Sequence, residues 1–216
     1  MKLDAHFFHA VKNSDLDDNG GILDISPILN NKKNNLLIDV TPDEVSQGLI
    51  RYRKLFLIPQ RELPFLKIYL SQPSTGTNNL LIHSGTPTDT QEDAENYISW
   101  KGSGLIYTAL LAGDITSIVV QSKNEGEGFN PFDIIRLSDD TNEDFIRINA
   151  VSWNGNIATL TCIPNSYINY NYPVVSYISA CIEKGVCSIT PIWVKEIIPE
   201  DIFYYRSSIN RLKCLF

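Results

Sequence analysis

Short runs of apolar and β-branched residues, separated by polar turns, dominate the sequence. Residues 50–58 and 63–70 are two such runs, and the polar residues 60–62 lie between them. β-Branched and aromatic residues in runs of this length are typical of strands. We therefore predict a pair of neighbouring strands joined by this polar loop, followed by a third short strand over residues 80–82.

Charged and aromatic residues alternate within the run at residues 50–58. Arg51 and Arg53 alternate with Tyr52 and Lys54. Successive side chains on a strand point to opposite faces, so the two arginines share one face and the other two residues share the opposite face. We expect a strand with one solvated face, in preference to a nucleic-acid groove of stacked rings and cations.

Two segments carry helix signals. Residues 41–48 begin with Thr41-Pro42-Asp43-Glu44, which places a capping threonine, a proline at the first helical position and a glutamate that completes a capping box. Residues 89–98 are acidic at their start, which suits the positive end of a helix dipole. We predict a short helix in each segment.

Strand signals continue after residues 101–104, a Gly- and Ser-containing segment that we interpret as a linker. The predicted strands cover residues 105–111, 115–121, 132–137, 145–151, 157–161 and 174–182. Asn154-Gly155 predicts a hairpin with a type I′ turn, because Asn and Gly tolerate positive φ at both central positions. Short strands at this spacing indicate an antiparallel sandwich or barrel.

These elements predict a mainly β protein built of two β-rich modules, with one or two short helices. The N-terminal module covers residues 1–101 and contains the helices, and the antiparallel C-terminal module covers residues 102–198. Residues 199–216 are predicted to form a C-terminal arm. Each module is expected to be an antiparallel sandwich or a barrel.

The predicted arm contains the only interface candidate that the sequence singles out. Its residues are Phe203, Tyr204, Tyr205 and Arg206. Aromatic residues and arginine are enriched in the buried parts of protein interfaces. The alternative is a final strand that packs on the protein's own core.

Composition excludes several classes of function. The chain has 216 residues, 43% of them hydrophobic, and a formal charge of −7. The apolar fraction is enough for a core, and the negative charge argues against a nucleic-acid groove or an anionic membrane surface. No apolar run approaches the roughly 20 residues that span a bilayer. Asp4 and His6 interrupt the apolar stretch of an ordinary signal peptide, so we expect a soluble protein that is not exported by one.

One acidic segment partly matches a calcium-binding loop. Asp15, Asp17 and Asn19, followed by Gly20, have the spacing of the first half of such a loop. The twelfth position is Ser26, so the bidentate glutamate is missing. We interpret the segment as an acidic turn, with a calcium site as the less favoured alternative.

The cysteines predict no metal site. Cys162, Cys181, Cys187 and Cys214 form no C-x-x-C pair, and no histidine lies near them in the sequence. We expect free or buried thiols, as in a reducing compartment. A disulfide between Cys181 and Cys187 across a hairpin is the alternative.

Catalytic motifs are also missing from the sequence. His83 lies near Ser84 and Asp89, but no G-x-S-x-G or other nucleophile signature accompanies them, so we expect a histidine at the edge of the solvent. Acidic residues of one predicted turn, which we expect to point into water, are Asp139, Asp140, Glu143 and Asp144. The sequence therefore predicts neither an enzyme nor a bound cofactor.

Three groups of motifs resemble the structural proteins of tailed bacteriophages. The first group is Asn34-Asn35-Leu36-Leu37-Ile38-Asp39-Val40-Thr41-Pro42-Asp43-Glu44, Gly48 and Tyr52-Arg53-Lys54-Leu55-Phe56. The second is Leu66-Lys67-Ile68-Tyr69-Leu70 and Gly85-Thr86-Pro87-Thr88-Asp89-Thr90-Gln91. The third is residues 102–105, 112–120, 132–139 and 145–148. At Asn130-Pro131-Phe132-Asp133 the chain departs from the pattern of this family, in which a glycine more usually precedes the acid.

The resemblance implies a non-enzymatic component of a virion that acts through subunit–subunit assembly. It favours the neck, connector or tail over capsid decoration, with copies of the chain and other virion proteins as partners. The implied location is the virion, after assembly in the cytoplasm of the host bacterium, with no membrane and no sequence-specific nucleic-acid binding. The alternative is a β-sandwich recognition module that binds a carbohydrate or a host surface. Its candidate aromatic platform is Trp100, Trp153 and Trp193.

Overall fold

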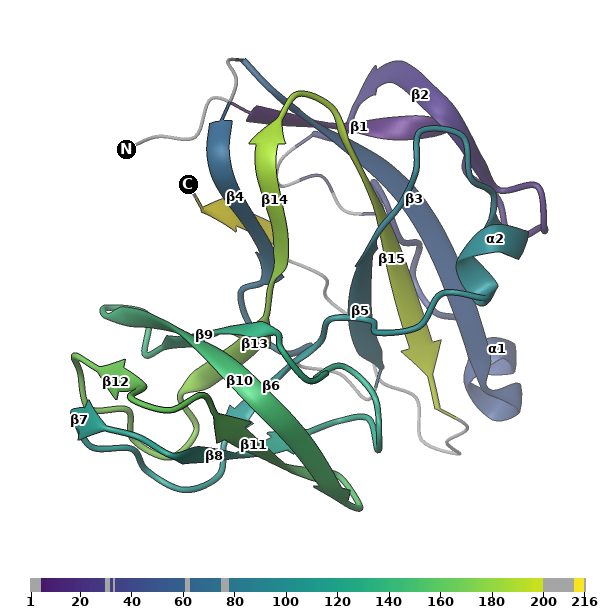
Figure 1. Cartoon of the computed structure of the whole chain (residues 1–216). Coiled ribbons are helices and arrows are strands. Elements are labelled where there is room, and N and C mark those ends of the chain that lie inside the picture. Colours follow the sequence, from purple (N-terminus) through teal and green to yellow (C-terminus); the bar gives the residue numbers. More distant parts are fainter. Residues whose placement is uncertain are drawn as a thin grey trace.

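Strands build almost all of the regular structure, as the sequence predicts. A computed structural model of the chain describes residues 5–29, 32, 34–60, 63–74, 78–199 and 212–215. Strands account for 54% of the structure and two short helices for 6%. The strands form a closed six-stranded barrel and three open sheets (Figure 1). The predicted fold class, mainly β with one or two short helices, is confirmed.

A five-stranded antiparallel sheet organises the N-terminal part of the protein. Its strands, in spatial order, are β2 (Gly20–Pro27), β1 (Ala5–Lys12), β3 (Leu49–Pro59), β15 (Thr190–Ile198) and β5 (Asn79–Ser84). A three-stranded sheet covers one face of it. That sheet consists of β14 (Ile182–Cys187), β4 (Leu63–Leu70) and β16 (Leu212–Leu215). The apolar core between the two sheets includes Leu57 of β3, Ile68 of β4 and Ile192 of β15.

The opposite face of the five-stranded sheet is also covered. Tyr52 on β3, Leu81 on β5 and Trp193 on β15 form a second core with Ala94 and Trp100. The strand β3 is therefore buried on both faces. The prediction that it has a solvated face is wrong, because Arg51, Tyr52, Arg53 and Lys54 are all buried.

The predicted pairing of the strands at residues 50–58 and 63–70 is also wrong. These runs form β3 and β4, but β3 pairs with β1 and β15, while β4 pairs with β14 and β16. Periodicity identifies a strand but carries no information about its partner. The two strands therefore belong to different layers of the sandwich.

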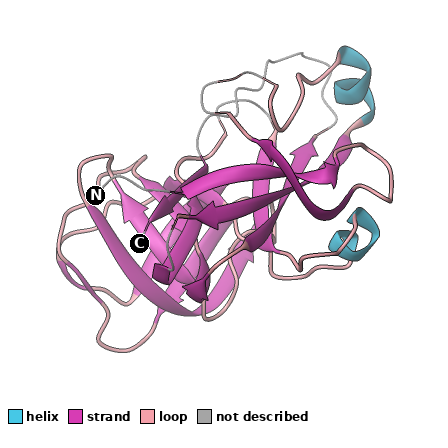
Figure 2. Cartoon of the chain, turned by 90° about the horizontal axis from the view of Figure 1, so that it is seen from above, coloured by secondary structure: helices cyan, strands magenta, loops and turns pink. Residues whose placement is uncertain are grey.

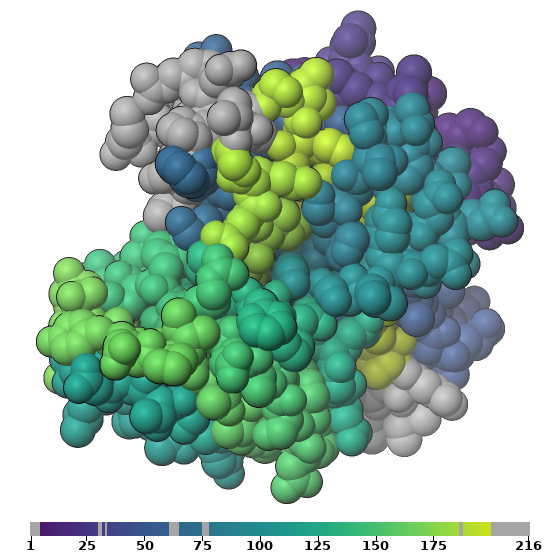
Figure 3. Space-filling model, viewed as in Figure 1, coloured from purple at the N-terminus to yellow at the C-terminus, as the bar shows by residue number. Residues whose placement is uncertain are grey.

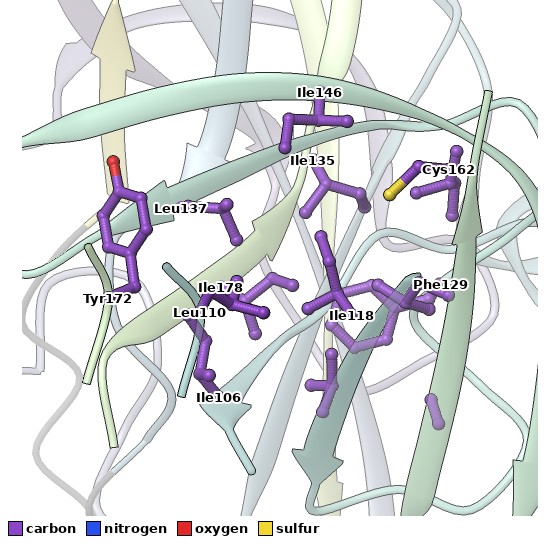
Figure 4. Close-up of a cluster of buried hydrophobic side chains, with 14 of the residues drawn as sticks. Ile106, Leu110, Ile118, Phe129, Ile135, Leu137, Ile146, Cys162, Tyr172 and Ile178 are labelled. Carbon is purple, nitrogen blue, oxygen red and sulfur yellow. The ribbon is translucent and has the colours of Figure 1, made fainter. Parts of the chain in front are cut away.

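The barrel follows in the sequence and has the closed order β10-β11-β8-β6-β13-β9. Its strands are β6 (Ser103–Ile106), β8 (Ser117–Ser122), β9 (Ile134–Ser138), β10 (Glu143–Asn154), β11 (Ile157–Cys162) and β13 (Tyr177–Ala180). A short two-stranded sheet, β7 (Gly113–Asp114) with β12 (Tyr167–Ile168), lies beside it. Alternate residues such as Ile118, Val120 and Leu160 are buried and fill the barrel. Figure 4 shows Ile118 in this core, together with Phe129 and Ile135.

The hairpin predicted around Asn154-Gly155 joins β10 to β11, but its turn is displaced by one residue. Asn154 pairs with Ile157, so Gly155 and Asn156 are the central residues of the loop. Of these two, Gly155 has a positive φ of 56° and Asn156 does not. A positive φ at the first central position alone is the pattern of a type II′ turn, so the prediction of a type I′ turn is wrong.

Both predicted helices are present and lie at the periphery of the strands (Figure 2). The first, α1 (Pro42–Gln47), has the expected capping box. The Glu44 side chain accepts a hydrogen bond from the Thr41 backbone nitrogen at 2.7 Å, and Thr41 Oγ1 accepts one from the Glu44 backbone nitrogen at 3.4 Å. The second, α2 (Gln91–Glu95), is shorter than the predicted segment.

The chain leaves the barrel earlier than the predicted module boundary. After β13 ends at Ala180, β14 and β15 pair with β4, β3 and β5 of the N-terminal part. The barrel therefore spans residues 103–180, and the strands up to residue 198 belong to the sandwich. Consecutive residues of β15 are buried, so both faces of this strand are covered. This burial fits the position of β15 inside the five-stranded sheet, between β3 and β5.

The predicted linker and arm also differ from the structure. Lys101 exchanges two backbone hydrogen bonds of 2.8 Å with Ile82, and the Gly102 nitrogen donates to the Gly128 carbonyl at 2.7 Å. A Cβ on Gly102 would lie 3.0 Å from the Cα of Gly128, so this close approach requires glycine. In the predicted arm, Leu212–Leu215 form the strand β16.

Candidate functional site

A cleft lies where the barrel meets the sandwich. Figure 3 shows the three parts of the chain that meet there, the barrel in green, β14 in yellow-green and the segment around β5 in teal. The cleft has a volume of about 260 Å³ and is open to solvent. Its lining residues are His83, Ser84, Ser99, Lys101, Phe132, Asp133, Ile134, Cys181, Ile182 and Glu183.

The charged side chains of the cleft form two ion pairs. The ammonium of Lys101 contacts the carboxylate of Asp133, which also accepts a 2.9 Å hydrogen bond from the Asn130 backbone nitrogen. Burial raises the pKa of Asp133, and the contact with Lys101 opposes this shift. At the rim, Arg147 Nη2 donates to Glu183 Oε2 at 2.9 Å. Each charge in the cleft therefore has an opposite charge beside it.

Phe132 forms an exposed aromatic wall of the cleft. The residue is 64% exposed, and its φ of +69° is rare for a residue other than glycine. The conformation is held by two contacts to β10, a 3.1 Å hydrogen bond from the Phe132 nitrogen to the Ile148 carbonyl and a 2.8 Å bond from Arg147 Nη1 to the Phe132 carbonyl. Phe132 therefore occupies a backbone position that favours glycine.

His83 lines the cleft but forms no triad with Ser84 and Asp89. Its ring stacks on Tyr97 with centroids 4.5 Å apart, and the half-buried environment lowers its pKa. The Asp89 carboxylate instead accepts a 2.9 Å hydrogen bond from Trp193 Nε1. His83 is therefore half-buried, and the prediction of a solvent-edge histidine is only partly correct.

The residues of the partial calcium motif form contacts with other elements of the sandwich. Asp15 forms a 2.6 Å ion pair with Arg53 on β3, and the backbone carbonyl of Asp17 accepts a hydrogen bond from α2. Asn19 is buried, and its Nδ2 donates to the Tyr52 carbonyl at 2.7 Å. Within the described part of the chain, no three His, Cys, Asp or Glu side chains are grouped as a metal site requires.

The acidic turn after β9 contains both exposed and buried carboxylates. Asp139 accepts hydrogen bonds from the backbone nitrogens of Thr141 at 2.9 Å and Asn142 at 2.6 Å, and these bonds lower its pKa. Asp144 is buried and accepts a 3.0 Å hydrogen bond from the Tyr172 hydroxyl. The expectation that the whole cluster points into water is therefore wrong for Asp144.

The tryptophans do not form an aromatic platform. Trp100 and Trp193 are buried with 2% and 0% exposure, and Trp153 is half-buried and packs against Phe129. The predicted candidates for carbohydrate stacking are therefore structural. The predicted interface residues Phe203, Tyr204, Tyr205 and Arg206 lie outside the described residues.

The cysteine side chains that the structure describes are buried and free. These are Cys162 in the barrel core and Cys181 at the floor of the cleft. Cys181 precedes β14 and Cys187 is its last residue, so the two lie at opposite ends of one strand. Six residues of extended chain span about 20 Å at ~3.3 Å per residue, which excludes the alternative of a disulfide between them.

Exposed apolar side chains gather on two adjacent loops at one end of the barrel. We call this surface the barrel cap, and its residues are Tyr107, Leu111, Tyr170, Val174 and Val175. The loops are joined by backbone hydrogen bonds between Leu110 and Tyr172, at 2.8 and 2.9 Å, and by a 3.0 Å bond from the Val175 nitrogen to the Ile106 carbonyl. Val175 has a φ of +70°, which is strained for a β-branched residue. The barrel cap is therefore apolar and held in place by the barrel.

Sequence reasoning missed both the cleft and the barrel cap. Each of them combines residues from segments that are far apart in the chain. Comparison of the chain with protein-family models, with curated proteins and with solved structures finds no match. Among the described residues, neither helix has the length and apolar character needed to cross a membrane.

Proposed function

We propose that the protein is a non-enzymatic structural component of a tailed-bacteriophage virion that acts through subunit–subunit assembly. The motifs over residues 20–180 support the virion, and the barrel cap is the observation that supports assembly. We place it in the neck, connector or tail in preference to the capsid surface. Its partners are copies of the chain and other virion proteins.

The barrel cap has the properties of a contact surface. Leu111 is 78% exposed and Val175 is 64% exposed, although neither side chain has a polar group to offer water. Contiguous apolar surfaces of this kind on a folded protein mark contacts with other proteins. Because the backbone of both loops is already hydrogen-bonded, little conformational entropy would be lost when a partner covers them.

The strand β2, at the edge of the five-stranded sheet, offers a second surface for contact with another chain. Its outer edge pairs with no described strand, and only Gly20 at its start forms a bridge, to Thr90. Ile22 and Ile25 on this strand are 58% and 87% exposed. An uncovered edge with apolar side chains favours pairing with another chain, which is useful to a subunit of an assembly.

Light scattering coupled to size-exclusion chromatography, with electron microscopy of the same samples, tests this proposal. We expect the protein to form rings or higher assemblies, and Leu111→Asp combined with Val175→Asp to shift it to monomers. Ile98→Asp is the matched control, because Ile98 is 80% exposed but lies in the sandwich part of the chain. A protein that stays monomeric at all concentrations and is missing from particles of its native source would refute the proposal.

A further inference from the structure

We propose that the cleft between the barrel and the sandwich binds a neutral saccharide whose ring stacks on Phe132. This is a binding function in addition to assembly, and it does not depend on the assembly proposal. Four properties of the cleft support it: its balance of charge, its apolar surfaces, its exposed hydrogen-bonding groups and the backbone conformation of Phe132.

The charges of the cleft favour a neutral ligand. Lys101 is paired with Asp133, and Arg147 at the rim is paired with Glu183. Within these two pairs, each positive charge is neutralised by a carboxylate beside it. An ionic ligand would have to break one of these contacts and leave a charge unpaired, which costs free energy in a partly buried site.

The apolar surfaces of the cleft match one face of a sugar ring. Phe132 supplies an exposed aromatic ring, while Ile182 and Cys181 supply a buried apolar floor. A pyranose presents C–H bonds on its faces and hydroxyl groups around its edge. Such a ring would bury its apolar face against Phe132 and direct its hydroxyl groups to the polar rim.

Hydrogen-bonding groups stand around this apolar surface. The Glu183 side chain is 42% exposed, and its pair with Arg147 uses the Oε2 atom. Lys101, with a side-chain exposure of 18%, and the hydroxyl groups of Ser84 and Ser99 complete the rim. These groups include donors and acceptors, as recognition of hydroxyl groups requires.

The size of the cleft suits a single sugar or the end of a longer glycan. Its volume of about 260 Å³ is below the ~300–1,000 Å³ of sites for drug-sized ligands. Because the cleft is open to solvent, a saccharide that fills it could continue beyond it. A glycan on a cell surface is therefore sterically compatible with the site.

The backbone of Phe132 provides an independent reason to assign a role to its side chain. At a φ of +69°, the backbone of Phe132 lies in a region that is strained for every residue except glycine. Phe132 as a whole is 64% exposed, so its ring contributes little to the protein's own core. A strained position that keeps an exposed aromatic ring is explained by contact of that ring with a ligand.

Because of the positive φ of Phe132, one variant at this position can test binding and still preserve folding. Phe132→Gly removes the ring at a position whose φ favours glycine, so we expect a thermal midpoint no lower than that of the wild type. Phe65→Gly is the matched control, because Phe65 on β4 also has a positive φ of 59° and is 77% exposed, but does not line the cleft.

Saturation-transfer NMR of the full chain with glucose, galactose, N-acetylglucosamine and rhamnose is the decisive experiment. We expect at least one of these sugars to bind, Phe132→Gly to weaken that binding by about tenfold or more, and Phe65→Gly to leave it unchanged. Glu183→Ala, which keeps the aromatic wall, should also weaken binding. The thermal midpoint of each variant shows whether it is folded.

Three results would overturn the proposal. These are no binding of any of the four sugars, equal binding by the wild type and Phe132→Gly, or binding of adenosine as a comparison ligand without binding of a sugar. Light scattering on the same samples reports assembly separately. A failure of sugar binding is therefore distinguishable from a failure of the assembly proposal.

Discussion

Lys54 and Asp89 form an ion pair in the interior of the sandwich, with side-chain exposures of 0% and 3%. The Lys54 ammonium also donates to the backbone carbonyls of Gly21 at 2.6 Å and Asp89 at 2.9 Å. Asp89 in turn accepts a hydrogen bond from Trp193 on β15. This pair therefore connects β2, β3, β15 and the segment before α2.

Removal of one partner of this pair should destabilise the protein strongly. Asp89→Ala leaves the Lys54 ammonium buried without its carboxylate, and we expect a loss of about 3–5 kcal/mol in the free energy of unfolding. Urea titration measures the loss. Asp18→Ala is the control, because the pair of Asp18 with Lys12 is exposed and should contribute about 1 kcal/mol or less. Equal losses in the two variants would contradict the prediction.

The same carboxylate should make the protein sensitive to acid. Burial acts to raise the pKa of Asp89, but hydrogen bonds from Lys54, Tyr97, Thr86 and Trp193 outweigh it and lower the pKa below the ordinary 3.8. A group with a lowered folded pKa stabilises the protein above its unfolded pKa, and this stabilisation is lost as the pH falls through the folded pKa.

We therefore expect the thermal midpoint of the wild type to fall between about pH 5 and pH 2 more steeply than that of Asp89→Asn. The asparagine keeps the shape of the side chain but does not titrate. Calorimetry over this range measures both proteins. Parallel curves for the wild type and Asp89→Asn would refute the assignment.

The buried thiols should be unreactive in the folded protein. Burial raises the pKa of Cys162 to about 11 and that of Cys181 to about 12. Alkylation requires the thiolate, so iodoacetamide at about pH 8 should label neither residue until the protein is unfolded. Peptide mass spectrometry with and without denaturant checks each site. Rapid labelling of Cys181 in the native protein would show that the floor of the cleft is open to reagents.

The turn between β10 and β11 should require glycine. Gly155 has a φ of +56°, and alanine at this position should cost about 1–2 kcal/mol of unfolding free energy. Gly185→Ala is the control, since Gly185 does not have a positive φ and a Cβ there would meet no atom within 4 Å. Denaturant titrations of both variants make the comparison. A tolerated Gly155→Ala would contradict the assigned turn.

Local chemistry was sufficient to predict several elements. Thr41 and Glu44 define the start of α1 because a capping box depends only on residues that are adjacent on one helical turn. The apolar runs predicted most strands, and Asn154-Gly155 predicted the hairpin between β10 and β11. The central turn residues were misplaced by one, because the register of the hairpin is set by packing of both strands in the barrel.

The burial of β3 and the candidate site could not be predicted in this way. Arg51 looked like a residue of a solvated face, but Glu196, which lies 145 positions later in the chain, approaches it at 3.5 Å and Glu44 contacts it directly. The cleft brings His83 together with Phe132 and Glu183 in the same manner. The residues next to a strand in the sequence do not indicate which residues it will contact, because a strand can pair with segments at any distance along the chain.

The order of apolar and polar residues by itself determined that this protein is built of strands with two short helices, because strand periodicity and helix caps are encoded within a few residues. Tertiary structure alone decided which strands pair, where the barrel ends and which charges are buried. The pairing of β14 and β15 with strands of the sandwich sets all three. The strand β15 takes the position between β3 and β5 in the open five-stranded sheet, and the course of the chain into β14 places Cys181 and Glu183 opposite the barrel. The physical reason is that sheet pairing and burial depend on surfaces that exist only once distant segments have come together.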